Sequence, residues 1–294
     1  MTSADANDSG PGGKMDLDPE VLKPLVAAIE EEFQKFPPTI AVIGLSGVGK
    51  SSTINAIFGT NRDVSATTRG TSRFHKRNFD VISNRVYGTG VRCTLRIIDA
   101  PGLGEDASLD RNYLQRYRQH LSEADIALWV LAARNRALAL DQQYLEALAD
   151  VLPPVVLGIN QVDLVDPLTW IEATNLPSRE QAANIETILK DRSERIGRVL
   201  GRPVEAVAFS ALRYYNLQAL FKVCLDQAPS GRRWMFEVLK SFTTRDWLAQ
   251  AKGLSAKQRQ DIEARFGLAD KPIQMGRFSI EQQTVASAAR EDDV

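Results

Sequence analysis

The sequence predicts an α/β fold in which a parallel sheet lies between two layers of helices. Short apolar runs alternate with helix-prone segments from Thr39 to Leu225, which is typical of parallel strands joined by helices on both faces. Polar residues follow several apolar runs directly, at the sheet edge where such folds bind ligands. The 294 residues, 44% hydrophobic and 25% charged, are enough for one large domain with an appendage.

We expect four parts along the chain. Residues 1–20, rich in Asp, Ser, Gly and Pro, predict a disordered tail, and residues 21–36 a short amphipathic helix. Residues 37–228 form the alternating domain, and residues 229–294 a helical C-terminal extension. The apolar residues that can share one face of the N-terminal helix are Val21, Leu22, Leu25, Val26, Ile29 and Phe33. We expect that face to pack on the domain, with partner docking as the alternative.

The elements of the domain follow in order. Expected strands cover 39–44, two stretches within 74–98 joined by a turn in 83–90, then 125–132, 155–159 and 204–209. Expected helices cover 50–58, a stretch ending near 121, then 140–152, 178–200 and 216–225. In the extension, residues 233–242, 245–254 and 255–266 read as helical. Residues 59–73 and 99–110 are polar and predict exposed loops.

Charge and cysteine content exclude several classes of protein. The net charge of −1 does not predict nucleic-acid binding, and we expect no direct DNA binding. Two cysteines and two histidines, each far from the others, predict neither a zinc site nor a disulfide and favour a cytoplasmic location. No apolar run approaches the roughly 20 residues of a membrane span, and residues 1–14 lack a signal-peptide core.

The stretch GLSGVGKSS, residues 44–52, matches G-x-x-x-x-G-K-[ST] between a strand and a helix. Its glycines allow the backbone to curl closely around a polyphosphate, so that its amides form an anion nest at a helix N-terminus. Lys50 should reach the β- and γ-phosphates, and the Ser51 hydroxyl should bind Mg²⁺. The residues expected to hold the phosphates are Gly44, Ser46, Gly47, Val48, Gly49, Lys50, Ser51 and Ser52.

Asp99 to Gly102 follow an apolar strand and give D-x-x-G. An aspartate at a strand end beside a phosphate loop can hold Mg²⁺, usually through water. The Gly102 amide can bond an oxygen of the γ-phosphate. Alone this motif is weak, but its place about fifty residues after Lys50 makes it specific.

Asn160 to Asp163, NQVD, also follow a buried strand and match [NT]-K-x-D except at Gln161. Guanine offers its N1–H and its exocyclic amine on one edge, and both can donate to the Asp163 carboxylate. Adenine presents an unprotonated nitrogen there, so the pairing selects guanine. Asn160 should bond the base and tie this loop to the phosphate loop, while Gln161 replaces the lysine whose stem usually covers the base.

Two further segments complete the expected site. Ser210-Ala211 ends the last strand, where the Ala211 amide could bond guanine O6. The loop over 66–73 should supply a hydroxyl to Mg²⁺ from Thr71 or Ser72, in a contact that forms only with the γ-phosphate. That loop would then order and release with the nucleotide state.

With these five motifs in order, the chain resembles the translation-factor class of P-loop GTPases, and most closely the Era-like, 50S-ribosome-binding group. The residues that carry the resemblance are GLSGVGKSSTINAIFG, GTSR, DAPGLGE, NQVD and FSA, within residues 39–228. The resemblance implies a three-layer GTPase domain with a mostly parallel sheet of about six strands. It also implies GTP and GDP as ligands, Mg²⁺, and hydrolysis of GTP in which Lys50, Ser72 and Gly102 act on the reacting phosphate.

Besides Gln161, the sequence departs from the family pattern at four points. Gly47 stands where potassium-using members have Asn, so we do not expect potassium stimulation, and Ser72 stands where Thr is usual. Leu103 follows D-x-x-G, where Ras-like enzymes have a water-positioning Gln. Polar groups near it that could act instead, or merely face solvent, are Glu105, Asp106, Arg134 and Arg136. The KH domain of Era itself, with its G-x-x-G loop, is absent, so RNA binding does not carry over.

Three functional readings remain open. The chain hydrolyses GTP slowly as a switch, or it is a GTP-dependent module that barely hydrolyses and signals to a protein or ribosomal partner, as Leu103 would favour. In the third, it dimerises through the loops at Ser72 and Glu105 when GTP is bound. A dynamin-like membrane role lacks a visible lipid-binding element, and Asp163 disfavours an ATPase.

Overall fold

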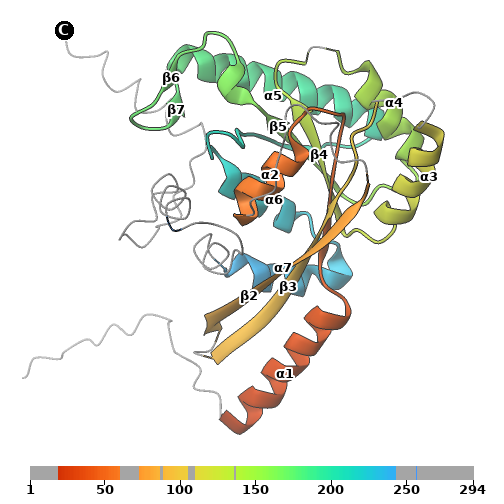
Figure 1. Cartoon of the computed structure of the whole chain (residues 1–294), viewed down its shortest axis with the longest axis vertical. Coiled ribbons are helices and arrows are strands. Elements are labelled where there is room, and N and C mark those ends of the chain that lie inside the picture. Colours follow the sequence, from red (N-terminus) through yellow and green to blue (C-terminus); the bar gives the residue numbers. More distant parts are fainter. Residues whose placement is uncertain are drawn as a thin grey trace, which may run out of the picture.

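The computed structural model describes residues 19–59, 73–86, 89–104, 110–135, 137–242 and Ala256. Its main sheet has the strand order β2-β3-β1-β4-β5-β8 (Figure 1). The strands are β1 (Thr39–Ile43), β2 (His75–Val86), β3 (Thr89–Asp99), β4 (Ile126–Ala132), β5 (Val155–Asn160) and β8 (Glu205–Ala208). Only β2 runs antiparallel to its neighbour, so the predicted mostly parallel six-stranded sheet is confirmed.

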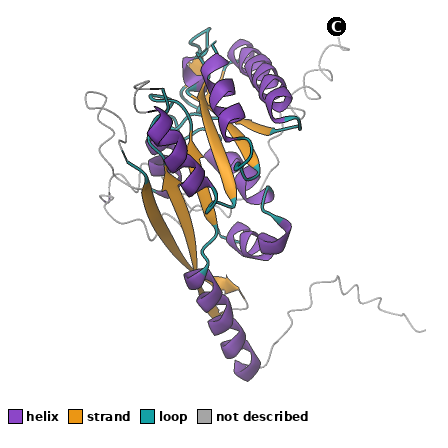
Figure 2. Ribbon diagram, turned by 90° about the vertical axis from the view of Figure 1, so that its right-hand side faces the viewer, coloured by secondary structure: helices purple, strands orange, loops and turns teal. Residues whose placement is uncertain are grey.

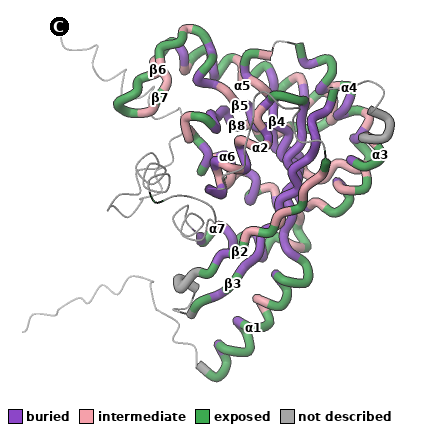
Figure 3. The backbone as a smooth tube through the Cα atoms, in the orientation of Figure 1, coloured by how far each residue is buried: buried purple, intermediate pink, exposed green. Residues whose placement is uncertain are grey.

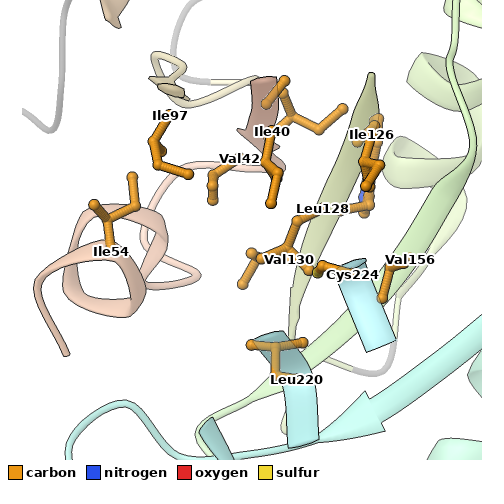
Figure 4. Close-up of a cluster of buried hydrophobic side chains, with 14 of the residues drawn as sticks. Ile40, Val42, Ile54, Ile97, Ile126, Leu128, Val130, Val156, Leu220 and Cys224 are labelled. Atoms are coloured by element: carbon orange, nitrogen blue, oxygen red, sulfur yellow. The ribbon is translucent and has the colours of Figure 1, made fainter. Parts of the chain in front are cut away.

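Helices cover both faces of this sheet (Figure 2). One layer contains α2 (Lys50–Phe58) and α6 (Leu217–Asp226), and the other α3 (Asp110–Leu121), α4 (Ala139–Leu148) and α5 (Arg179–Leu200). Consecutive residues of β4 show the division, because neighbouring strand residues point to opposite faces. Leu128 lies with Ile54 of α2 and Leu220 of α6 (Figure 4), while the indole of Trp129 donates to Asp141 of α4.

The core follows the central strands (Figure 3). Every residue of β1 and β5 is buried, as expected for strands with helices on both faces. Their near-continuous apolar sequences, TIAVI and VVLGIN, are the reason they can occupy that position. The rigid sheet in turn fixes the loops that leave its carboxyl edge.

Helix α1 (Pro19–Lys35) packs against β3 and ends just before β1 begins. Its residues Leu22, Val26 and Phe33 are buried, and the Phe33 ring meets Trp234 edge to face. The predicted apolar face was too wide, because Val21 and Leu25 are 57% and 43% exposed. The sheet covers a narrower stripe of the helix than the sequence pattern indicated.

An ion pair joins α1's exit to the C-terminal extension. The Asp125 carboxylate, at the amino end of β4, accepts the Thr39 amide at 2.8 Å and Arg232 Nη1 at 2.9 Å. Arg232 also donates to the Phe36 carbonyl. These contacts hold the start of β1 and the short 3₁₀ turn η2 (Ser230–Arg232) together, directly before α7 (Arg233–Lys240).

Several elements differ from the sequence predictions. Helix α4 ends at Leu148 rather than at residue 152, since the chain there turns toward Pro153 and Pro154. The 3₁₀ turn η1 (Val162–Leu164) and the small hairpin of β6 (Trp170–Ile171) and β7 (Leu176–Pro177) were not predicted. Of the expected tail over residues 1–20, Pro19 and Glu20 are the first residues of α1, and residues 1–18 lie outside the described residues. The expected helices over 245–254 and 255–266, apart from Ala256, also lie outside them, and the division into domains stays a prediction. None of the described helices is long and apolar enough to cross a membrane.

Candidate nucleotide-binding site

The glycine-rich loop lies at the carboxyl end of β1, pressed against β4 and β5. At Gly44, φ is 143° and an added Cβ would lie 2.4 Å from the Val130 carbonyl oxygen. At Gly49, φ is 92° and a Cβ would lie 2.4 Å from Asn160 Nδ2. Both positions therefore require glycine for the loop to close. At Gly47 an added Cβ would have open space, but the left-handed φ of 76° still favours glycine.

Lys50 begins α2, and its ammonium folds back over the loop. Nζ donates to the Gly44 carbonyl at 3.1 Å and the Leu45 carbonyl at 2.8 Å, and the residue is 6% exposed. Farther along α2, the Thr53 hydroxyl donates to the Gly49 carbonyl at 2.8 Å. A buried cation and the N-terminal end of a helix dipole thus meet in one loop, which suits a polyphosphate.

Asp99 and Ser51 meet at the side of this loop. Asp99 ends β3 and is fully buried, and the Ser51 hydroxyl donates to its carboxylate at 3.0 and 3.3 Å. A hydroxyl and a carboxylate are the hard oxygen donors that Mg²⁺ prefers, so the pair fits such an ion. Among the described residues, no group of three His, Cys, Asp or Glu could hold a metal. An ion at this position would therefore depend largely on phosphate and water oxygens.

The segment after Asp99 continues along the phosphate loop as a backbone ladder. The Ala100 amide donates to the Val42 carbonyl, Leu103 N–H to the Gly44 carbonyl, and Ser46 N–H to the Leu103 carbonyl at 3.0 Å. Gly102, in the same segment, is buried, and its contact with the γ-phosphate stays a prediction. The Leu103 side chain is only 1% exposed and packs in the core, so it cannot orient a water molecule.

Asn160, the last residue of β5, joins three loops. Its Nδ2 donates to the Val48 carbonyl at 2.9 Å, and its Oδ1 accepts the Ala211 amide at 3.0 Å. Gln161, at a left-handed φ of 64°, donates from Nε2 to the Gly47 carbonyl at 3.3 Å. The expected tie between the two loops is therefore present, although the Ala211 amide would have to leave Asn160 to bond a base.

Asp163 lies in η1 and is 8% exposed. Its Oδ1 is buried without a hydrogen-bond partner among the described residues. Gln181 of α5, which no motif indicated, holds the backbone around it: Nε2 donates to the Val165 carbonyl at 2.8 Å and the Asp163 carbonyl at 3.3 Å. A positioned carboxylate with an unpaired oxygen can accept the two donors of a guanine edge.

The remaining expected residues fall into two groups. Ser210 is fully buried, and its hydroxyl accepts a hydrogen bond from the Arg213 amide. Ser46 and Gly47 are exposed in the phosphate loop, and Ser52 is half-buried in α2. Arg134 is exposed in the turn after β4, next to Asn135, whose carbonyl accepts a bond from Arg192. Five candidates lie outside the described residues: Thr71, Ser72, Glu105, Asp106 and Arg136.

Comparison with known proteins agrees with this arrangement. The family described as 50S ribosome-binding GTPase matches residues 39–161. The chain is 32% identical over 142 residues to the uncharacterized protein YkfA of Escherichia coli (46% of this chain, 45% of YkfA). It is 26% identical over 196 residues to the GTPase Era of Aquifex aeolicus (65% of this chain, 57% of Era). These matches span about half the length of each relative.

A solved structure is also similar: Era in complex with MgGDPNP and a segment of 16S ribosomal RNA, with a TM-score of 0.48 and 23% identity over 66% of this chain and 57% of that one. The family match covers the phosphate loop, D-x-x-G and the first two residues of NQVD, and the GTPase Era shares a longer stretch. Residues 39–161 match the 50S ribosome-binding GTPase family, and the chain is similar to Era-like P-loop GTPases of the translation-factor class.

Proposed function

We propose that this chain binds GTP and GDP with Mg²⁺, hydrolyses GTP to GDP and phosphate, and acts as a switch between the two nucleotide states. The observation that carries the proposal is the Asn160 bridge. One amide side chain joins the phosphate loop at Val48 to the Ala211 loop. It stands three residues before Asp163, whose Oδ1 has no hydrogen-bond partner in the described part of the chain. These contacts support the proposal because they join the loop expected to bind phosphate directly to the segment expected to select the base.

Each residue has a distinct task in this proposal. The loop amides and Lys50 bind the β- and γ-phosphates and stabilise charge that develops on the transferring phosphoryl group. When bound, Mg²⁺ supplies further charge neutralisation at the phosphate oxygens, and Ser51 and Asp99 are the described residues that would hold it. Asp163 accepts the N1–H and amine of guanine, and the Gly102 amide orients the γ-phosphate. Ser72 is proposed to complete the metal site.

Nucleotide titration tests this function. Fluorescent GDP, GTP and ATP analogues are titrated into the wild type and into Asp163→Ala, with phosphate release followed in parallel. We expect guanine analogues to bind at least about a hundredfold more tightly than ATP, and the variant to lose that selectivity, because a buried donor pair would be left without an acceptor. Equal affinity for ATP, or selectivity that survives in the variant, contradicts the base-recognition argument.

The second candidate is a GTP-dependent binding or assembly module with negligible intrinsic hydrolysis. Leu103 favours it: the side chain at the usual glutamine position is buried, and its backbone is bonded on both sides to the phosphate loop. In this reading the partner is a second copy or a protein or ribosomal surface, and it completes the catalytic group. Phosphate release measured with and without ribosomal subunits, together with the mass of the GTP-bound protein in solution, separates the two candidates.

A further inference from the structure

Arg77 reaches the metal side of the site, although no motif pointed to it. It lies on β2, the antiparallel edge strand, whose register pairs His75 with Asp99 and Arg77 with Ile97. Its Nη2 lies 3.4 Å from Asp99 Oδ2 and forms an ion pair with that carboxylate. The Asp99 side chain is fully buried and the Arg77 side chain 19% exposed, so the pair is shielded from most solvent screening.

Asp99 Oδ2 is shared between two groups. It accepts the Ser51 hydroxyl at 3.0 Å and faces the Arg77 guanidinium at 3.4 Å. A buried carboxylate is costly unless a positive charge compensates it. Arg77 supplies that charge. It does so at Asp99 Oδ2, the oxygen that a cation between Ser51 and Asp99 would also need.

We propose that Arg77 is a resident counter-charge at the magnesium site, which competes with Mg²⁺ for Asp99 and so sets the Mg²⁺ concentration at which the protein holds GTP tightly. This inference rests on the proposed function. A guanidinium and a divalent cation repel each other over a few ångströms, and this repulsion is strong where water is excluded. Mg²⁺ also keeps several of its waters, which need space next to Asp99. The guanidinium must therefore turn away when the ion enters.

Lys76 provides a matched control. Lys76 directly precedes Arg77 on β2, and its Nζ forms an ion pair with Glu123 at 2.5 Å rather than with Asp99. Successive strand residues point to opposite faces, so Lys76→Gln removes the same charge from the same strand without touching the metal side. Both side chains are at least partly exposed, and folding of each variant is checked by its thermal unfolding without nucleotide.

The test measures binding of a fluorescent, non-hydrolysable GTP analogue over a series of free Mg²⁺ concentrations. We expect Arg77→Gln to lower the half-saturating Mg²⁺ concentration by about tenfold and Lys76→Gln to change it by less than about twofold. Arg77→Lys, which keeps the charge on a shorter side chain, should fall between Arg77→Gln and the wild type. If Arg77→Gln does not fold, Arg77→Lys is compared with the wild type instead.

The outcomes separate the two levels of the argument. An unchanged or raised midpoint in Arg77→Gln, with clear Mg²⁺ dependence in the wild type, overturns the inference and leaves the proposed function standing. Equal shifts in Arg77→Gln and Lys76→Gln overturn it as well, because the effect would then be one of general charge. Binding by the wild type that does not depend on Mg²⁺ overturns the magnesium assignment, and this inference with it.

Discussion

Two buried aspartates at opposite ends of the sheet differ in one respect. Asp125 stands at the amino end of β4 and Asp163 follows the carboxyl end of β5, and their exposures are nearly equal, 9% and 8%. Asp125 has both carboxylate oxygens in contact with Arg232 and also accepts the Thr39 amide. Asp163 keeps Oδ1 without a partner among the described residues. The two carboxylates are thus almost equally buried but differ in their hydrogen-bond partners.

The difference indicates which end of the molecule serves the fold and which serves a ligand. A buried carboxylate that is fully paired holds secondary-structure elements together, and its removal leaves its donors without an acceptor. A buried carboxylate with an unpaired oxygen contributes little to the stability of the fold, so its presence is best explained by a ligand that completes it. Three predictions test this contrast, in order of decreasing effect on stability.

The first concerns Asp125→Ala. We expect the free energy of unfolding to fall by about 3 kcal/mol, because Arg232 and the Thr39 amide would lose their acceptor at a buried site. Urea denaturation at neutral pH measures the loss. Asp125→Asn, which can still accept the amide hydrogen bond, should lose less, and a loss below about 1 kcal/mol in the alanine variant would contradict the structural role.

The second concerns Asp141, which lies between the two extremes. Its Oδ1 accepts the Trp129 indole at 2.9 Å, while Oδ2 has no partner among the described residues. Burial raises the pKa of Asp141 from 3.8 to about 6, against the opposing effects of the Trp129 hydrogen bond and the Arg192 and Lys50 charges. Because the folded state holds this proton more tightly, its contribution to stability is full below about pH 4 and is lost as pH rises through 6.

Asp141→Asn removes that titration. The free energy of unfolding of the variant minus that of the wild type should increase as pH rises from 4 to 6 and level off above, by about 2 to 3 kcal/mol for a shift of about two pH units. Urea denaturation at a series of pH values gives the difference directly. A difference that stays flat across this range would show that the carboxyl is not perturbed.

The third concerns Asp163→Ala and should have the smallest effect on the empty protein. We expect its free energy of unfolding to lie within about 0.5 kcal/mol of the wild type, since Oδ1 gives up no partner among the residues that the structure describes. Thermal unfolding without and with GDP makes the contrast visible. GDP should raise the melting temperature of the wild type by mass action and leave that of the variant unchanged. A large loss without nucleotide would place Asp163 with Asp125 instead.

The sequence predicted well the parts of the molecule that depend on local pattern. Apolar runs such as DIALWVLA indicated the strands, and the motif GLSGVGKSS indicated the phosphate loop. Both could be predicted because each signal lies within a few consecutive residues. The predicted tie between Asn160 and the phosphate loop is present, since parallel strands bring their carboxyl ends together whatever their separation along the chain. The roles of these residues with a nucleotide stay predictions.

Contacts that depend on side-chain direction could not be predicted. Arg77 meets Asp99, and Arg232 meets Asp125 from 107 positions away, with no motif to pair either couple. In the sequence, Gln181 is one of many polar residues in a polar helix. Only the folded structure shows that its side chain donates to the Asp163 and Val165 carbonyls, at and just after NQVD. The hairpin of β6 and β7 has strands of two residues, too short to show a period.

The Asn160 bridge has a consequence for the order in which the protein matures. Its two partners stand 112 residues before it and 51 residues after it. A growing chain on the ribosome can display the phosphate loop, Asp99 and Asp163 well before the Ala211 amide has been synthesised. Until that amide arrives, the side chain that joins the loops lacks one of its two anchors. Under the proposed function, guanine recognition would therefore be among the last properties that a newly made chain acquires, after most of its sheet has formed.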